Sequence, residues 1–295
     1  MRRRRAPDMG TSRFARQRQA GRRWSVAGVV AGLLVGTALA APASWLADAL
    51  GEASGGRLQL AEARGTVWNG SAVAVLTGGS GSRDAAALPG RLHWTLRPGW
   101  RGLRIGMRQD CCIPDLLTLQ LSPAWSGYTL TVGAADPAAV PAPGAPGAPE
   151  APREWGHWPA AWLAGLGAPF NTLALGGTLR LASPGLVVQS VQGRLRLEGR
   201  LDAELLDVRS RLSPLPVLGS YRLALQGTPG GGETALVTLA TLGGALQMNG
   251  QGQWSGGRLR FRGEARAAPG QDAALANLLS LIGRRQGAVS SLLIG

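Results

Sequence analysis

The sequence contains no lysine and little material for metal or nucleophilic chemistry. Among its 295 residues are two histidines, three phenylalanines and two cysteines, which are adjacent. This supply is too small for a His/Cys zinc cluster or for a separate Cys–His pair with supporting groups. No GxSxG, HExxH, P-loop or paired CxxC motif occurs. We therefore predict a non-enzymatic protein with no catalytic, cofactor-binding or metal-binding residues.

The absence of lysine also shapes the charge. All 31 basic residues are arginine, against 17 acidic residues, for a net charge of +14. An arginine-only chain this rich in Ala and Gly is better explained by codon bias than by phosphate recognition. Residues 1–23 hold nine of the arginines with Asp8 as the one acid, so this tail carries +8 and the remaining 272 residues carry +6. The body is therefore mildly basic, and we predict no nucleic-acid partner.

A long uncharged run follows the arginine-rich tail. From Trp24 to Ala47 there are 24 residues without charge, about 36 Å as a helix, which is enough to cross a hydrocarbon core of about 30 Å. The arginines before it place residues 1–23 in the cytoplasm by the positive-inside rule. We expect a transmembrane helix at 24–47 and a periplasmic body at 48–295 in a Gram-negative cell.

Two alternatives concern this N-terminal region. Ala38-Leu39-Ala40 fits a signal-peptidase site, so the segment could instead be a cleaved signal peptide. Both interpretations export the body. The arginine tail is interpreted as a topology determinant that also touches anionic headgroups. A docking site for a cytoplasmic partner is the alternative.

Beyond residue 55 the apolar residues recur with period two, the pattern of strands with one buried face. The alternating segments are 57–60, 92–96, 118–121, 128–132, 194–198, 221–226 and 258–262. Turn signals such as Asn69-Gly70, Pro98-Gly99 and Pro184-Gly185 separate them. Short strands at this spacing favour an all-β fold. With few aromatics to fill a sandwich core, we predict a long curled antiparallel sheet or half-open barrel.

Two segments interrupt the alternation. Residues 134–152 hold six prolines among Ala and Gly and are predicted to form a loop within the body. The tryptophan-rich stretch Glu154–Gly165 that follows predicts a short helix or an aromatic plug, with packing favoured over binding. Near the C-terminus, Asp272–Ile282 has helical spacing and ends at Gly283. This short helix is expected to cap the core, with docking to a membrane protein as the alternative.

The remaining polar residues do not form a recognisable site. Neither His93 nor His157 has a Ser or carboxylate arrangement that would make a triad. Asp110 and Asp115 flank Cys111-Cys112, but the spacing fits no tetrahedral metal site. Because a disulfide between adjacent cysteines is uncommon, we interpret the pair as two thiols in a loop. A link to a partner chain is the alternative in an oxidising compartment.

Several motifs, in one order, resemble those of the type II secretion system protein N (GspN) family over residues 20–295. Besides the arginine-rich start and the apolar segment, they are Gly65–Gly70 (GTVWNG), Leu218–Leu223 (LGSYRL), Leu239–Leu246 (LATLGGAL), Gly250–Trp254 (GQGQW) and Phe261–Arg285. The Ala/Pro stretch at 134–152 looks like an insertion. The motifs predict fold determinants: Gly65 and Gly70 bracket a turn, Trp68 anchors the core, and Tyr221 holds its hydroxyl at the rim of an apolar face.

The resemblance implies a single-pass accessory subunit of the inner membrane that takes part in exporting folded proteins across the outer membrane. The partners would be other inner-membrane secretion subunits, contacted through a strand edge, the flank of the membrane span or the final helix. That family is grouped with AsmA-like envelope proteins, whose curled sheets have an apolar groove. A lipid-binding or lipid-transfer protein is therefore the rival hypothesis.

Overall fold

The computed structural model describes residues 28–133 and 152–295. The expected tail (1–23), the first residues of the expected span (24–27) and the expected loop up to residue 151 lie outside the described residues. The chain divides into two units, Met1–Pro42 and Ala43–Gly295. In the first unit, residues 28–39 are helical, and apolar side chains such as Val29, Leu33 and Leu34 are exposed. Within the described ranges, no helix combines the length and the apolar character needed to cross a membrane.

The second unit begins with helix α2, Ala43–Ala53. Its residues Ala43 and Ala47 are buried against Leu60, Ala72 and Trp94 of the sheet. The last five residues of the expected span at 24–47 therefore form the first turns of a helix that packs on the body.

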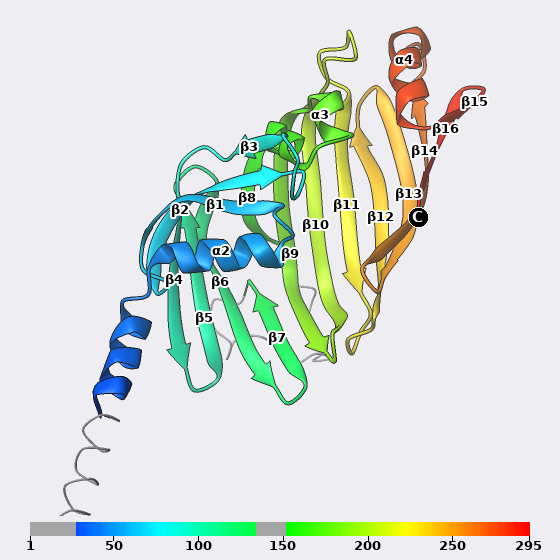
Figure 1. Cartoon of the computed structure of the whole chain (residues 1–295). Helices are drawn as coiled ribbons and strands as arrows, with labels where there is room; N and C mark the ends of the chain where they lie inside the picture. The colour runs from blue at the N-terminus through cyan, green and yellow to red at the C-terminus, as the bar shows by residue number, and fades with distance from the viewer. Residues whose placement is uncertain (1–27, 134–151) are drawn as a thin grey trace, which may run out of the picture. The chain divides into compact units, whose positions relative to one another are not determined.

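One antiparallel sheet of 16 strands forms most of this unit (Figure 1). Its first nine strands are β1 Leu58–Gly65, β2 Asn69–Thr77, β3 Ala85–Ala87, β4 Leu92–Gly99, β5 Gly102–Gln109, β6 Ile113–Ala124, β7 Gly127–Val132, β8 Arg153–Pro159 and β9 Gly176–Val191. The others are β10 Arg194–Arg209, β11 Gly219–Gly227, β12 Thr234–Gly243, β13 Leu246–Ser255, β14 Arg258–Ala267, β15 Arg284–Gln286 and β16 Val289–Ile294. The predicted all-β antiparallel fold is confirmed, and every segment predicted from alternation lies mostly or wholly within a strand.

The sheet is open, with β1 and β15 at the two ends of the strand order. Most strands pair with their neighbours in sequence, as in a meander. The non-consecutive pairs are β2 with β4, β7 with β9 and β14 with β16. Strand β9 has 16 residues, and two other strands share one of its edges. Residues Leu186–Val191 pair with β7, whereas Thr178–Ser183 pair with β8.

One local prediction was wrong, and a second holds for only part of its segment. Pro184-Gly185 is not a turn but lies inside β9, where the register with β10 shifts between the pairs Arg200↔Gly185 and Asp202↔Ala182. This bulge accommodates a proline, which has no N–H to donate to the ladder. The tryptophan-rich stretch forms strand β8 and then a 3₁₀ helix, η1 Ala160–Leu166, rather than one helix. Residues 153–159 form a strand because their backbone pairs with the long strand β9.

Short elements cover parts of the apolar face of the sheet. Besides α2, these are η1, the short helix α3 (Phe170–Leu173) and helix α4, Asp272–Ile282. The sequence predicted α4 with these bounds. Its Leu275, Leu278 and Leu279 are buried in a core cluster with residues of β10, β11, β13 and β14. The capping interpretation is thereby supported over docking for this face of the helix.

Candidate functional site

A continuous apolar face runs across the sheet. One row of register partners is Leu103, Leu121, Leu130, Val188 and Leu197, which come from five adjacent strands. Farther on, Leu201 pairs with Leu225, and Leu225 pairs with Val237. Side chains alternate between the faces of a strand, so these residues share one face. The opposite face carries Arg, Glu, Gln and Thr.

The covering elements that the structure describes leave part of this face open. It is an apolar groove of about 280 Å³ over β10 to β14, lined by Leu197, Leu201, Ala203, Leu223, Leu225, Val237, Trp254 and Leu259. None of the lining residues is charged. Leu223 in the middle of β11 keeps 44% of its surface exposed. Soluble proteins normally bury a contiguous set of apolar side chains. The exposed leucines of this groove therefore suit an apolar ligand.

Beside the groove, two glycines make room for one aromatic ring, and a third lies against the Cβ of the same residue. A Cβ on Gly250 would lie 2.4 Å from the Phe261 ring, and one on Gly263 would lie 2.9 Å from it. A Cβ on Gly252 would lie 3.0 Å from the Cβ of Phe261. Phe261 therefore lies over these glycines of β13 and β14 and is buried by them. The motif Gly250–Trp254 functions here as a cradle for Phe261.

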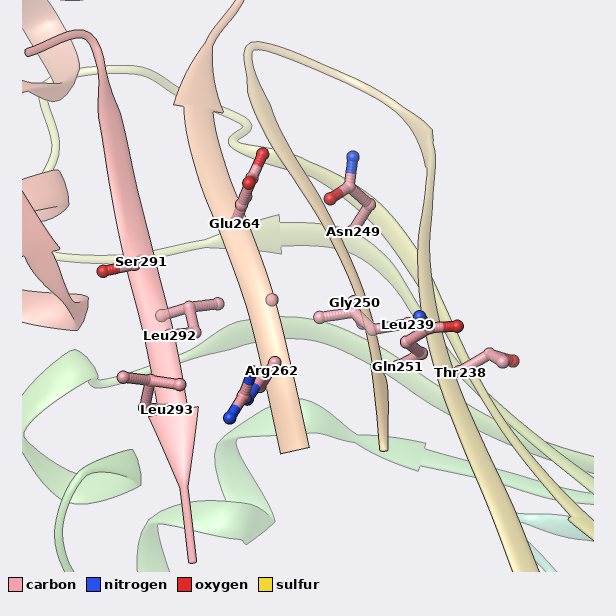
Figure 2. Close-up of a pocket in the computed structure, with 11 residues that line it drawn as sticks. Thr238, Leu239, Asn249, Gly250, Gln251, Arg262, Glu264, Ser291, Leu292 and Leu293 are labelled. Carbon is pink, nitrogen blue, oxygen red and sulfur yellow. The ribbon is translucent and has the colours of Figure 1, made fainter. Parts of the chain in front are cut away.

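On the polar face, a second hollow of about 590 Å³ lies over β12, β13, β14 and β16 (Figure 2). Thr238, Gln251 and Arg262 occupy successive register positions there, and Glu264 follows Arg262 on the same strand. The hollow is shallow and open. In the residues that the structure describes, no three His, Cys, Asp or Glu side chains gather in a way that could hold a metal.

A buried carboxylate joins three strands on the same polar face. Glu204 of β10 is 4% exposed. It accepts a hydrogen bond from Nε of Arg222 at 2.8 Å and another from Nε of Arg180 at 3.0 Å. Burial raises the pKa of Glu204, but the hydrogen bonds and charges of the two guanidinium groups lower it by more, so the net pKa lies below its usual 4.5. The side chains of Arg180 and Arg222 cover the carboxylate of Glu204 on this face of the sheet.

The lowered pKa predicts a pH-dependent contribution to stability. A carboxyl group with a depressed pKa in the folded state stabilises the fold fully above its unfolded pKa, about 4.5, and loses this contribution as the pH falls through the folded value. We expect Glu204→Gln to cost about 1 kcal/mol at neutral pH, because both arginines are partly exposed to solvent. The difference from wild type should shrink below about pH 4.5 when urea unfolding is measured across pH.

Glu264→Gln is the matched control, since Glu264 is exposed and forms no ion pair within the described ranges. Its unfolding free energy should follow that of wild type at every pH. If the free energy of unfolding had the same pH profile in wild type and in Glu204→Gln, the ionised Glu204 carboxylate would not stabilise the fold.

The structure shows where the residues of the first predicted motif, Gly65–Gly70, lie. Gly65 and Gly70 flank the turn between β1 and β2, as predicted. Trp68 is half-buried and packs against the first core cluster. The Trp94 ring lies against Gly70, where a Cβ would come within 2.5 Å of it, and no local sequence pattern indicates this contact.

Tyr221 corrects a prediction. Its side chain is buried, and the hydroxyl donates a hydrogen bond to the backbone oxygen of Leu246 at 2.9 Å rather than lying at the rim. Burial raises the pKa of this phenol. Tyr221 thus connects the motifs Leu218–Leu223 and Leu239–Leu246 inside the core beneath α4.

The cysteines and histidines form no site. Cys111 and Cys112 are bonded to each other in the turn between β5 and β6, so the prediction of two loop thiols was wrong. The turn places both sulfur atoms on one side of the chain, and no cysteine is left for an interchain link. His157 contacts Glu154 on β8 at 3.1 Å, whereas His93 lies on β4. The two histidines therefore lie on separate strands, β8 and β4.

Comparison with known proteins accounts for these motifs. The model of the family described as type II secretion system (T2SS), protein N, matches residues 56–291. No curated protein and no solved structure gives a significant match. The match spans nearly the whole second unit, including the open sheet and α4. The chain therefore belongs to the type II secretion system protein N family.

Proposed function

We propose that the chain is a non-enzymatic accessory subunit of the type II secretion system, anchored in the inner membrane with its body in the periplasm. Family membership supports a role in type II secretion. The anchor would lie within residues 24–42, ahead of α2. The exposed apolar side chains of residues 28–39, such as Leu33 and Leu34, support it, and the arginines before it support a cytoplasmic N-terminus.

The proposed partners are other inner-membrane secretion subunits, bound at a sheet edge. The last pair between β15 and β16 is Arg284↔Ser291, so β16 extends beyond its short partner. Leu293 and Ile294 in this extension are exposed. An edge with free backbone groups and apolar side chains suits addition of a strand from a partner. The buried face of α4 packs in the core and is not available for this contact.

Site-specific photocrosslinking tests this contact. A photoreactive residue at Leu293 of the full chain, in cells that assemble the secretion system, should crosslink to an inner-membrane secretion subunit. The same residue at Leu236, an exposed leucine on the polar face of β12, is the control and should give no such product. Absence of the crosslink at Leu293 would contradict edge recognition.

The intact mass of the membrane-extracted chain tests the anchor. We expect the complete sequence, because the proposed helix stays in the membrane. A mature protein beginning near Ala41 would instead identify a cleaved signal peptide and refute the anchor.

One observation favours a second function, lipid binding. The apolar groove over β10 to β14 is open and lined without a charged side chain. We propose an acyl chain as its ligand, since a flexible apolar chain can follow the row of leucines. In this alternative the protein binds or transfers envelope lipids.

Filling the groove provides the test. Phospholipid should co-purify with the detergent-extracted chain, as measured by mass spectrometry of the extracted lipids, and Ala203→Trp should abolish it because Ala203 lines the groove. Ala240→Trp is the control, since Ala240 is exposed on the opposite face of β12. A wild-type protein without bound lipid would contradict this function.

A further inference from the structure

Two adjacent hairpins project from one end of the sheet (Figure 1). The first joins β4 to β5 through residues 99–102, and the second joins β6 to β7 through residues 124–127. Their strands are neighbours, because Leu103 pairs with Leu121 just inside both turns. They approach closely enough that a Cβ on Gly102 would lie 2.1 Å from the Leu121 oxygen. The two turns therefore form one surface, here termed the hairpin rim.

Each turn of the hairpin rim presents a tryptophan to solvent. Trp100 is 96% exposed, and Trp125 is fully exposed. Tyr128, three residues after Trp125, is also exposed. Tryptophan is a large apolar side chain with one polar N–H. Full exposure of Trp100 and Trp125 therefore leaves a large apolar area in water, which is unfavourable. Two indoles at protruding tips indicate a surface that is covered in use.

Three arginines lie in the hairpin rim or on the strands next to it. Arg97 and Arg104 stand directly opposite each other in the register of β4 and β5, an arrangement of like charges that opposes pairing. Arg101 lies over the Trp100 ring at 5.8 Å from its centroid. In the part of the chain that the structure describes, none of these three arginines forms an ion pair. An anionic partner would neutralise the repulsion.

From this combination we propose that the hairpin rim docks on the surface of an anionic phospholipid bilayer. Tryptophan is enriched at membrane–water interfaces, where its ring lies at headgroup level and its N–H stays hydrated. The guanidinium groups bind lipid phosphates. Protruding tips can enter a headgroup layer, whereas a protein partner would need pockets for both indoles. The hairpin rim is separate from the apolar groove and from the β16 edge, so this docking is independent of lipid binding in the groove and of contact with secretion subunits.

Quenching of tryptophan fluorescence by lipids brominated near the headgroup tests the docking. The full chain is reconstituted into vesicles of phosphatidylglycerol and phosphatidylethanolamine. The fluorescence of wild type should be quenched more than that of the Trp100→Ala/Trp125→Ala variant. This difference in quenching, here called the gap, isolates the rim from the chain's other tryptophans. Replacing Arg97, Arg101 and Arg104 by Gln should lower the docking equilibrium about fivefold for each charge removed and so shrink the gap.

Arg209→Gln is the matched control, because Arg209 is exposed at the opposite end of β10. It should leave the gap unchanged. In phosphatidylcholine vesicles the gap should be small. Circular dichroism verifies folding of each variant, and since both tryptophans are exposed, the double variant should fold. No gap in anionic vesicles, an equal gap in phosphatidylcholine, or a gap that appears only when a secretion subunit is added would overturn the proposal.

Discussion

Leu278→Ala is expected to lower the free energy of unfolding by about 2–5 kcal/mol, measured by urea denaturation of the detergent-solubilised chain. Leu278 lies in α4 and is 2% exposed. It packs in the cluster that contains Val208, Leu218 and Tyr221. Removing its side chain costs the transfer free energy of the lost methyl groups and leaves a cavity that the sheet cannot collapse to fill.

Leu281→Ala on the same helix is the control. Leu281 is 57% exposed, so its replacement should change stability by less than about 0.5 kcal/mol. The contrast separates burial from any effect on helix propensity, because both changes replace leucine by alanine. Equally small effects at both positions would mean that α4 does not cap the core, and would return it to the candidates for partner contact.

Gly244→Ala is expected to cost about 3 kcal/mol or more. Gly244 has φ of +128°, a conformation that residues with a side chain rarely adopt. Its Cβ would lie 2.2 Å from the Cα of Gly219 and 2.6 Å from the oxygen of Leu218. Both neighbours are backbone atoms of the Leu218–Leu223 motif and cannot rotate away. The junction between the two family motifs would have to open.

Gly243 provides an unusually close comparison. It precedes Gly244, and a Cβ there would meet nothing within 4 Å. Gly243→Ala should therefore change stability by no more than about 0.5 kcal/mol in the same urea measurement. If the two alanine variants were equally stable, the close approach at Gly244 would not be a determinant of this fold.

Local sequence patterns predicted much of the fold because the sheet has two different faces. Segments such as 194–198 alternate leucine with arginine or glutamate, and period two determines both the strand and the orientation of each side chain. Helix α4 was predicted with its correct bounds because Asp272, the spacing of its leucines and Gly283 mark its start, face and end.

These failures share a cause in contacts that one strand makes with another. Strand β13 lacks apolar alternation because Gly250 and Gly252 occupy its apolar positions, where Phe261 of the next strand supplies the missing bulk. Pro184 indicates a turn locally, yet pairing with β10 holds it in a bulge. Tyr221 was expected at the rim, but the fold of β13 brings the Leu246 oxygen to its hydroxyl. A local pattern contains none of these partners.

By itself, the sequence determined an antiparallel sheet with one apolar face, a capping helix, and the family resemblance through its motifs. Only the tertiary structure decided which part of that face stays open. Helix α2 covers one end of the face and helix α4 covers the other. The two helices are far apart in the sequence. Their docking depends on side-chain complementarity in three dimensions, whereas alternation records only which side of a strand is apolar. The groove over β10 to β14 is the region that neither helix reaches.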